Sequence, residues 1–133
     1  MRGLAAVPLL GFVLALANLV AFMANGFDQV WFEFGLPSGA KLTLTAGWCL
    51  VLAGLVLLYV EIFKATRTGQ ASIVDHVLSL VVFVVALVEF VIAPRFGHQA
   101  FLAIIAMTLI DVIAGFTVTI SSARRDFGVP PHS

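Results

Sequence analysis

The sequence predicts an all-α polytopic membrane protein: a four-transmembrane-helix bundle formed by a single transmembrane domain, residues 1–133. The first observation behind this prediction is composition. Hydrophobic residues make up 62% of the chain and charged residues only 11%, whereas soluble domains carry about 25% charged residues. The second is pattern, because the apolar residues form four long runs separated by short polar breaks. A surface this apolar requires lipid as its solvent.

The four apolar runs cover residues of about 4–24, 42–63, 73–93 and 99–121. As helices, runs of this length span the roughly 30 Å of hydrocarbon in a bilayer. The valine-rich part of the third run favours a strand by propensity, but a lone strand in lipid would leave its backbone unpaired, so we predict helices throughout. A cleaved signal peptide is the alternative for the first run. Its continuation through Leu19, Val20 and Phe22 favours a retained helix.

The positions of lysine and arginine predict the orientation of the bundle. With four spans, the two termini and the middle loop lie on one side of the membrane. That side carries Arg2, Lys64, Arg67, Arg124 and Arg125, and the other side carries Lys41 and Arg95. Because cytoplasmic loops are rich in these residues, we expect both termini in the cytoplasm. The expected location is a bacterial inner (cytoplasmic) membrane.

The loop between the first two runs predicts a short interfacial helix over residues of about 27–36. Phe27, Trp31 and Phe34 fall on one helical face, and acidic and amide side chains lie away from it. Such a helix would rest on the membrane with its aromatic rings at the level of the lipid headgroups.

Each predicted span also has one face of small or polar side chains at helical spacing. Faces of this kind allow helices to approach closely and to form hydrogen bonds across the gap, so we expect them to meet inside the bundle. In chain order, the faces are Gly11, Ala15, Asn18, Phe22 and Asn25; Gly47, Val51, Gly54, Leu58 and Glu61; Asp75, Ser79, Val82, Ala86 and Glu89; and Thr108, Asp111, Gly115, Thr119 and Ser122.

One candidate intramembrane polar site centres on Asp111, near the middle of the fourth run. A charge at that depth costs at least about 3 kcal/mol on insertion scales, so the group must be protonated, paired or facing water. Asn18 lies within roughly one helical turn of the same depth and is the expected neutral partner. Thr108 lies on the face of Asp111, and Glu89 lies roughly one turn inside the outer surface. The candidate site is therefore Asp111, Asn18, Glu89 and Thr108.

A second candidate cluster lies on the cytoplasmic side and contains Glu61, Lys64, Asp75 and His76. Glu61 precedes Lys64 by three residues, and we expect it to form an ion pair at headgroup level with Lys64 or Arg67. His76 follows Asp75 at the start of the third run, where an interfacial histidine is the simplest interpretation. A functional role is the alternative for Glu61.

The sequence indicates no catalytic, cofactor-binding or metal site. It contains no nucleophile with a base, no glycine-rich phosphate loop and no metal-ligand spacing, and its single cysteine, Cys49, excludes an internal disulfide. His76 and His98 fall at opposite ends of their spans, roughly 30 Å apart, so they cannot ligate one haem. We therefore expect no cofactor and favour a protein without enzymatic activity.

Two hypotheses for function follow. Minimal loops and an apolar body favour a small integral membrane subunit or accessory protein that packs against and stabilises a larger membrane complex. The alternative is a small oligomeric proton- or cation-coupled transporter or channel that uses Asp111 and Glu89. Membrane lipids and other membrane protein subunits or further copies of this chain are the expected partners. The formal net charge of zero gives no indication of nucleic-acid binding.

Overall fold

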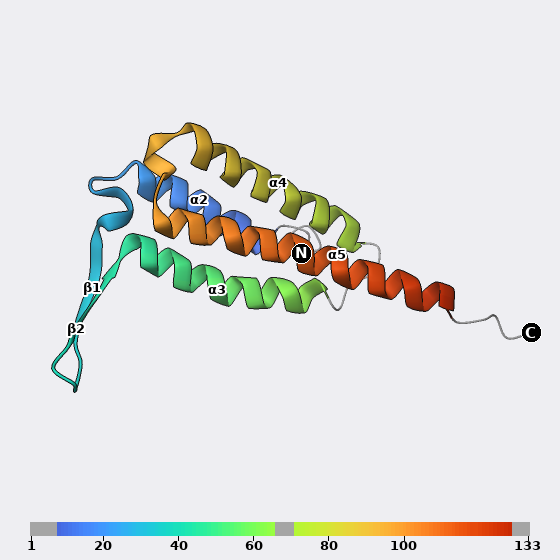
Figure 1. Cartoon of the computed structure of the whole chain (residues 1–133), viewed down its shortest axis with the longest axis horizontal. Coiled ribbons are helices and arrows are strands. Elements are labelled where there is room, and N and C mark those ends of the chain that lie inside the picture. The colour runs from blue at the N-terminus through green and yellow to red at the C-terminus, as the bar shows by residue number, and fades with distance from the viewer. Residues whose placement is uncertain (1–7, 66–70, 129–133) are drawn as a thin grey trace, which may run out of the picture.

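The computed structural model describes residues 8–65 and 71–128. Three helices in these ranges are long and apolar enough to cross a membrane, which indicates a membrane protein, and a fourth apolar helix is shorter. Residues 4–7 of the first predicted span lie outside the described residues, and its helix ends at Ala21 rather than near residue 24. The helices are α2 (Leu9–Ala21), α3 (Ala46–Ala65), α4 (Ala71–Ile92) and α5 (Gln99–Gly128) (Figure 1).

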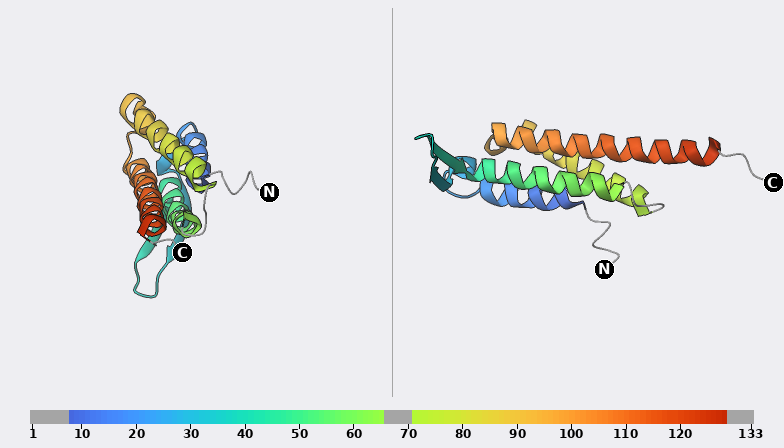
Figure 2. Two further views of the ribbon diagram at one scale, coloured as in Figure 1. Left: turned by 90° about the vertical axis from the view of Figure 1, so that its right-hand side faces the viewer. Right: turned by 90° about the horizontal axis from the view of Figure 1, so that it is seen from below.

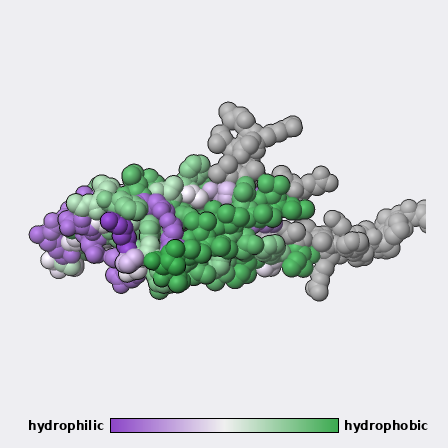
Figure 3. Space-filling model, turned by 90° about the horizontal axis from the view of Figure 1, so that it is seen from above, coloured by the Kyte–Doolittle hydropathy of each residue, from purple (hydrophilic) through white to green (hydrophobic). Residues whose placement is uncertain are grey.

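The helices form an elongated bundle in which α5 packs along α3 and α4, and α2 packs chiefly against α3 (Figure 2). Large apolar side chains such as Val56, Val81 and Val91 point outward. Apolar residues cover most of the helical body, whereas hydrophilic residues gather at the end where α3 begins (Figure 3). Apolar side chains on the outside suit a bundle solvated by lipid.

The small and polar faces of three helices meet inside the bundle, as the sequence predicts. The whole predicted face of α3 is buried, and the faces of α4 and α5 are buried or half-buried wherever their side chains are described. Glycine allows the closest approaches. A Cβ atom at Gly47 would lie 2.7 Å from that of Ala100, and one at Gly54 would lie 2.8 Å from the Met107 sulfur. Replacing these glycines would push α3 away from α5.

The predicted face of α2 is wrong. Ala15, Phe22 and Asn25 are exposed, and the helix buries apolar residues instead: Leu10, Val13, Leu14, Ala17, Val20 and Ala21. Leucine and valine pack equally well against protein and against lipid tails. Polarity alone therefore does not determine which side of an apolar helix turns inward.

The loop between α2 and α3 is a β-hairpin, so the predicted interfacial helix over residues 27–36 is wrong. A 3-10 turn (Gly26–Asp28) precedes β1 (Val30–Gly35) and the antiparallel β2 (Lys41–Thr45). Backbone outside the hydrocarbon can pair as strands, and the aromatic residues of this segment favour that pairing. The sharp turn includes Gly39 with φ +90°. Because β2 occupies the start of the second predicted span, α3 begins at Ala46 rather than near residue 42.

Candidate functional site

Five ionisable side chains from three helices come together where α3 ends and α4 begins. This group, called here the ionisable cluster, joins the predicted cytoplasmic-side cluster to one residue of the predicted intramembrane site. Asp75 interacts electrostatically with Glu61, Lys64 and His76, and Asp111 interacts with Glu61, Asp75 and Lys64. Its members are Glu61, Lys64, Asp75, His76 and Asp111.

Glu61 connects α3 to the start of α2. Its side chain is only 1% exposed, its Oε1 accepts a hydrogen bond of 2.8 Å from the backbone N–H of Leu9, and Lys64 Nζ lies 3.1 Å from the same oxygen. The first N–H groups of a helix have no partner within the helix, and the N-terminus attracts negative charge. Glu61 therefore supplies an acceptor that α2 lacks. The predicted pairing with Lys64 is present, but it lies inside the bundle rather than on an exposed surface.

Asp111 faces α3 and α4 rather than α2. Its carboxyl group is buried and interacts with the side chain of Ser79. The predicted partnership with Asn18 is wrong, because the Asn18 amide donates to the Leu14 carbonyl at 2.9 Å and to Glu89 Oε1 at 3.2 Å. Asn18 lies three residues before the end of α2, beside Glu89 near the hairpin end of the bundle, whereas Asp111 lies farther along the bundle, beside Glu61 and Asp75.

The predicted intramembrane site is therefore divided in two. Asn18 and Glu89 form a pair near the hairpin end of α2 and α4, whereas Thr108 lies one turn before Asp111 on α5. The Thr108 side chain is 1% exposed, and its hydroxyl donates 2.6 Å to the carbonyl oxygen of Ile105. The hydroxyl is therefore satisfied within its own helix, and it lies one turn from the ionisable cluster.

His76 and Asp75 are buried, although the sequence suggests headgroup-level positions for them. His76 is 5% exposed and Asp75 is 8% exposed. Among the described residues, His76 Nε2 and Asp75 Oδ1 are buried without a hydrogen-bond partner. An unpaired buried polar atom costs about 1–3 kcal/mol. Such atoms are rare, and each calls for an explanation such as a bound ion, a bound water or a chemical role.

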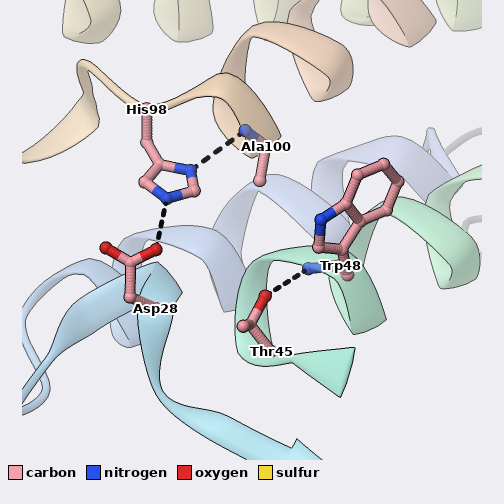
Figure 4. A network of polar contacts seen from close by, with 5 residues as sticks. All are labelled: Asp28, Thr45, Trp48, His98 and Ala100. Carbon is pink, nitrogen blue, oxygen red and sulfur yellow. Dashed lines mark hydrogen bonds and ion pairs between the residues drawn. The ribbon is translucent and has the colours of Figure 1, made fainter. Parts of the chain in front are cut away.

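A separate polar network lies at the opposite end of the bundle (Figure 4). His98 Nδ1 accepts a 3.0 Å hydrogen bond from the Ala100 N–H, so its Nε2 carries the hydrogen donated 2.9 Å to Asp28 Oδ1. Thr45 plays the same role for α3 by accepting from the Trp48 N–H at 3.3 Å. Both residues cap helix N-termini, so this network is structural. One signal of this network is visible in the sequence, because a threonine just before an apolar helix is a typical N-cap.

These features define the class of the protein: a helical membrane protein whose interior contains a buried cluster of carboxyl groups with an imidazole and an ammonium group. No group of three or more histidine, cysteine or acidic side chains in the described part of the chain could hold a metal ion. Carboxyl groups next to an imidazole can take up, share and release protons. No known protein family, curated protein or solved structure matches the chain.

Proposed function

We propose that this protein carries protons, or a small cation, across a membrane through the ionisable cluster. One observation carries the proposal: Glu61, Asp75 and Asp111, from three different helices, are all buried and interact electrostatically with one another, and His76 is buried next to Asp75. Charges inside a membrane are costly and mark ion pathways, proton relays or charge pairs. Packing alone does not require them, because replacing buried charges with apolar residues of similar volume is often neutral or stabilising.

The balance of charge within the cluster also supports proton or cation binding. Among the described residues of the cluster, three carboxylates face the one ammonium group of Lys64, which leaves an excess of two negative charges when His76 is neutral. An apolar bundle does not tolerate that excess, so the cluster has to bind protons or a cation to compensate. A proton bound by His76 would offset one of these two excess negative charges.

The position of the cluster suggests how it communicates with water. The Lys64 side chain is 22% exposed, so the cluster reaches the surface where α3 ends. By the distribution of lysine and arginine, that end faces the cytoplasm and both termini lie on the same side, in a bacterial inner membrane. Glu89, bonded to Asn18 near the other end, is the carboxyl group that would serve the opposite side.

Asp111 gives the sharpest test of the proposal. Asp111→Asn preserves size and hydrogen-bonding capacity toward Ser79 but cannot titrate. We expect the wild-type protein in liposomes to dissipate a proton or cation gradient, and we expect the Asn variant to assemble normally and lose that flux. The measurement combines size-exclusion chromatography with a pH-sensitive dye inside the liposomes, and with a cation-sensitive dye in a parallel series.

Two further variants control this experiment. Glu33→Gln makes the same carboxyl-to-amide change at an exposed ion pair on the hairpin and should leave flux unchanged. Asp111→Leu removes hydrogen bonding and should weaken assembly whether the role of Asp111 is functional or structural. Wild-type flux no greater than that of protein-free liposomes, or full flux in the Asn variant, would contradict the proposal.

The length of α5 supports a second function, that of a membrane subunit or accessory protein in a larger complex. The helix has 30 residues, roughly 45 Å at 1.5 Å per residue, and it continues past the ends of α3 and α4 (Figure 1). The candidate membrane span within α5 covers Gln99–Thr117. The last turns of the helix would then project from the membrane, where a partner subunit can bind them.

Purification in a gentle detergent tests this second function. We expect the full chain to retain a stable larger partner and a chain ending at Thr117 to lose it, provided that both insert equally into the membrane. A full-length protein that purifies only with copies of itself would favour the transport function alone.

A further inference from the structure

The hairpin between α2 and α3 has one apolar and one polar face. Directly opposed residues of an antiparallel pair lie on the same face of the sheet. Phe32 pairs with Leu44 and Phe34 with Leu42, so these four side chains form a face called here the apolar hairpin face. The other face carries Thr43 opposite Glu33, with Lys41 Nζ 3.1 Å from Glu33 Oε1.

Three of the four side chains of the apolar hairpin face are exposed, and Leu44, nearest α3, is half-buried. Phe32 is 52% exposed, Phe34 is 49% exposed and Leu42 is 42% exposed. The two phenylalanine rings stack on each other with centroids 6.2 Å apart. A lone two-stranded hairpin is marginally stable in water, and this one also exposes apolar area that favours transfer out of water. Something apolar is therefore expected to lie against it.

The direction of the hairpin indicates what that is. It leaves the end of the bundle sideways rather than along the helices (Figures 1 and 2). Because the helices cross the membrane, a segment running sideways from their end runs along the membrane surface. The apolar medium at that level is the lipid itself, and aromatic side chains are enriched there.

We propose that the hairpin lies on the bilayer as an interfacial anchor, with the apolar hairpin face in the lipid headgroup region and the opposite face toward water. The ion pair between Glu33 and Lys41 suits this arrangement, because both charges remain on the face away from lipid and neutralise each other. Such an anchor would fix the depth and tilt of α3 in the membrane, because α3 begins at the residue that follows β2. This inference rests on membrane insertion and is independent of proton or cation transport.

Two single-tryptophan variants of the full chain test the proposal in phosphatidylcholine vesicles. In a Trp31→Phe, Trp48→Phe background, Phe34→Trp places a probe on the apolar hairpin face, and Thr43→Trp places a matched probe on the polar face. We expect phosphatidylcholine brominated near the top of its acyl chains to quench the first probe strongly, and aqueous iodide to quench the second several-fold more than the first. Size-exclusion chromatography confirms that both variants are assembled.

Equal iodide quenching of the two probes would overturn the proposal, because the hairpin would then be solvated on both faces. Protection of Phe34→Trp from iodide in native membranes but not in pure lipid vesicles would also overturn it, since a partner protein would then cover this face. If the brominated lipid quenched Thr43→Trp more strongly than Phe34→Trp, the hairpin would lie in the reverse orientation, which would exclude the proposed contact.

Discussion

The imidazole of His76 lies directly against Gly115 of the neighbouring helix. A Cβ atom added at Gly115 would come within 2.5 Å of His76 Nδ1 and 2.7 Å of its Cε1. Real Cβ atoms do not approach so closely, so the imidazole can be buried at this position only because residue 115 is a glycine. The ring also lies 6.0 Å from that of Phe116, measured between centroids.

Gly115→Ala should therefore displace His76 and loosen the contact between α4 and α5. We expect a loss of about 1–3 kcal/mol in the free energy of unfolding, as is usual for overpacking, measured in mixed detergent micelles. Gly11→Ala is the matched control, because its Cβ would meet Val82 at an ordinary 3.6 Å. Adding His76→Ala to the Gly115→Ala variant should recover part of the loss. Equal stability of the two alanine variants would contradict this packing.

Glu61 should be required for the start of α2 to remain helical. Glu61→Leu leaves the Leu9 N–H without its acceptor, at a cost of about 1–3 kcal/mol, whereas Glu61→Gln retains an oxygen that can accept the bond. We expect faster hydrogen–deuterium exchange at the N-terminal turn of α2 in the Leu variant and only a small change in the Gln variant. Unchanged exchange in the Leu variant would show that this hydrogen bond does not hold the helix end.

The partner of Asn18 can be identified by double-mutant cycles. Because Asn18 donates to Glu89, alanine substitutions at these two positions should show a coupling energy of about 0.6 kcal/mol, the average for hydrogen bonds between membrane helices. Asn18 and Asp111 should show no coupling within error. The measurement is the free energy of unfolding of each variant. Coupling between Asn18 and Asp111, without coupling between Asn18 and Glu89, would contradict the observed hydrogen bond.

The proposed orientation is testable with single cysteines in a Cys49→Ala background. Ser38 is the better position in the hairpin turn, since Gly39 has φ +90° and a cysteine there would be strained. We expect Ser38→Cys to react with a membrane-impermeant maleimide in intact cells and Ser133→Cys to react only after lysis. The reverse result would invert the orientation, and reaction of both in intact cells would exclude an even number of spans.

The sequence by itself determined that the chain is a helical membrane protein, because exclusion of polar groups from lipid acts on every residue separately. It also identified the inward faces of α3, α4 and α5, where glycine and acidic residues distinguish one side of an otherwise apolar helix. Glu61, Asp75 and Asp111 were selected as candidates on the same basis, and the structure brings all three together.

Only the tertiary structure decided which candidates are neighbours. The depth of a residue depends on where its helix begins and ends, and the neighbours of each helix depend on contacts across the whole bundle. For this reason Asn18 pairs with Glu89 rather than Asp111. Near the membrane surface, water allows both helices and strands, so three aromatic residues at helical spacing did not reveal the hairpin. Its pairing of Phe34 with Leu42 depends on two segments joined by a turn, and periodicity within one segment cannot predict such a contact.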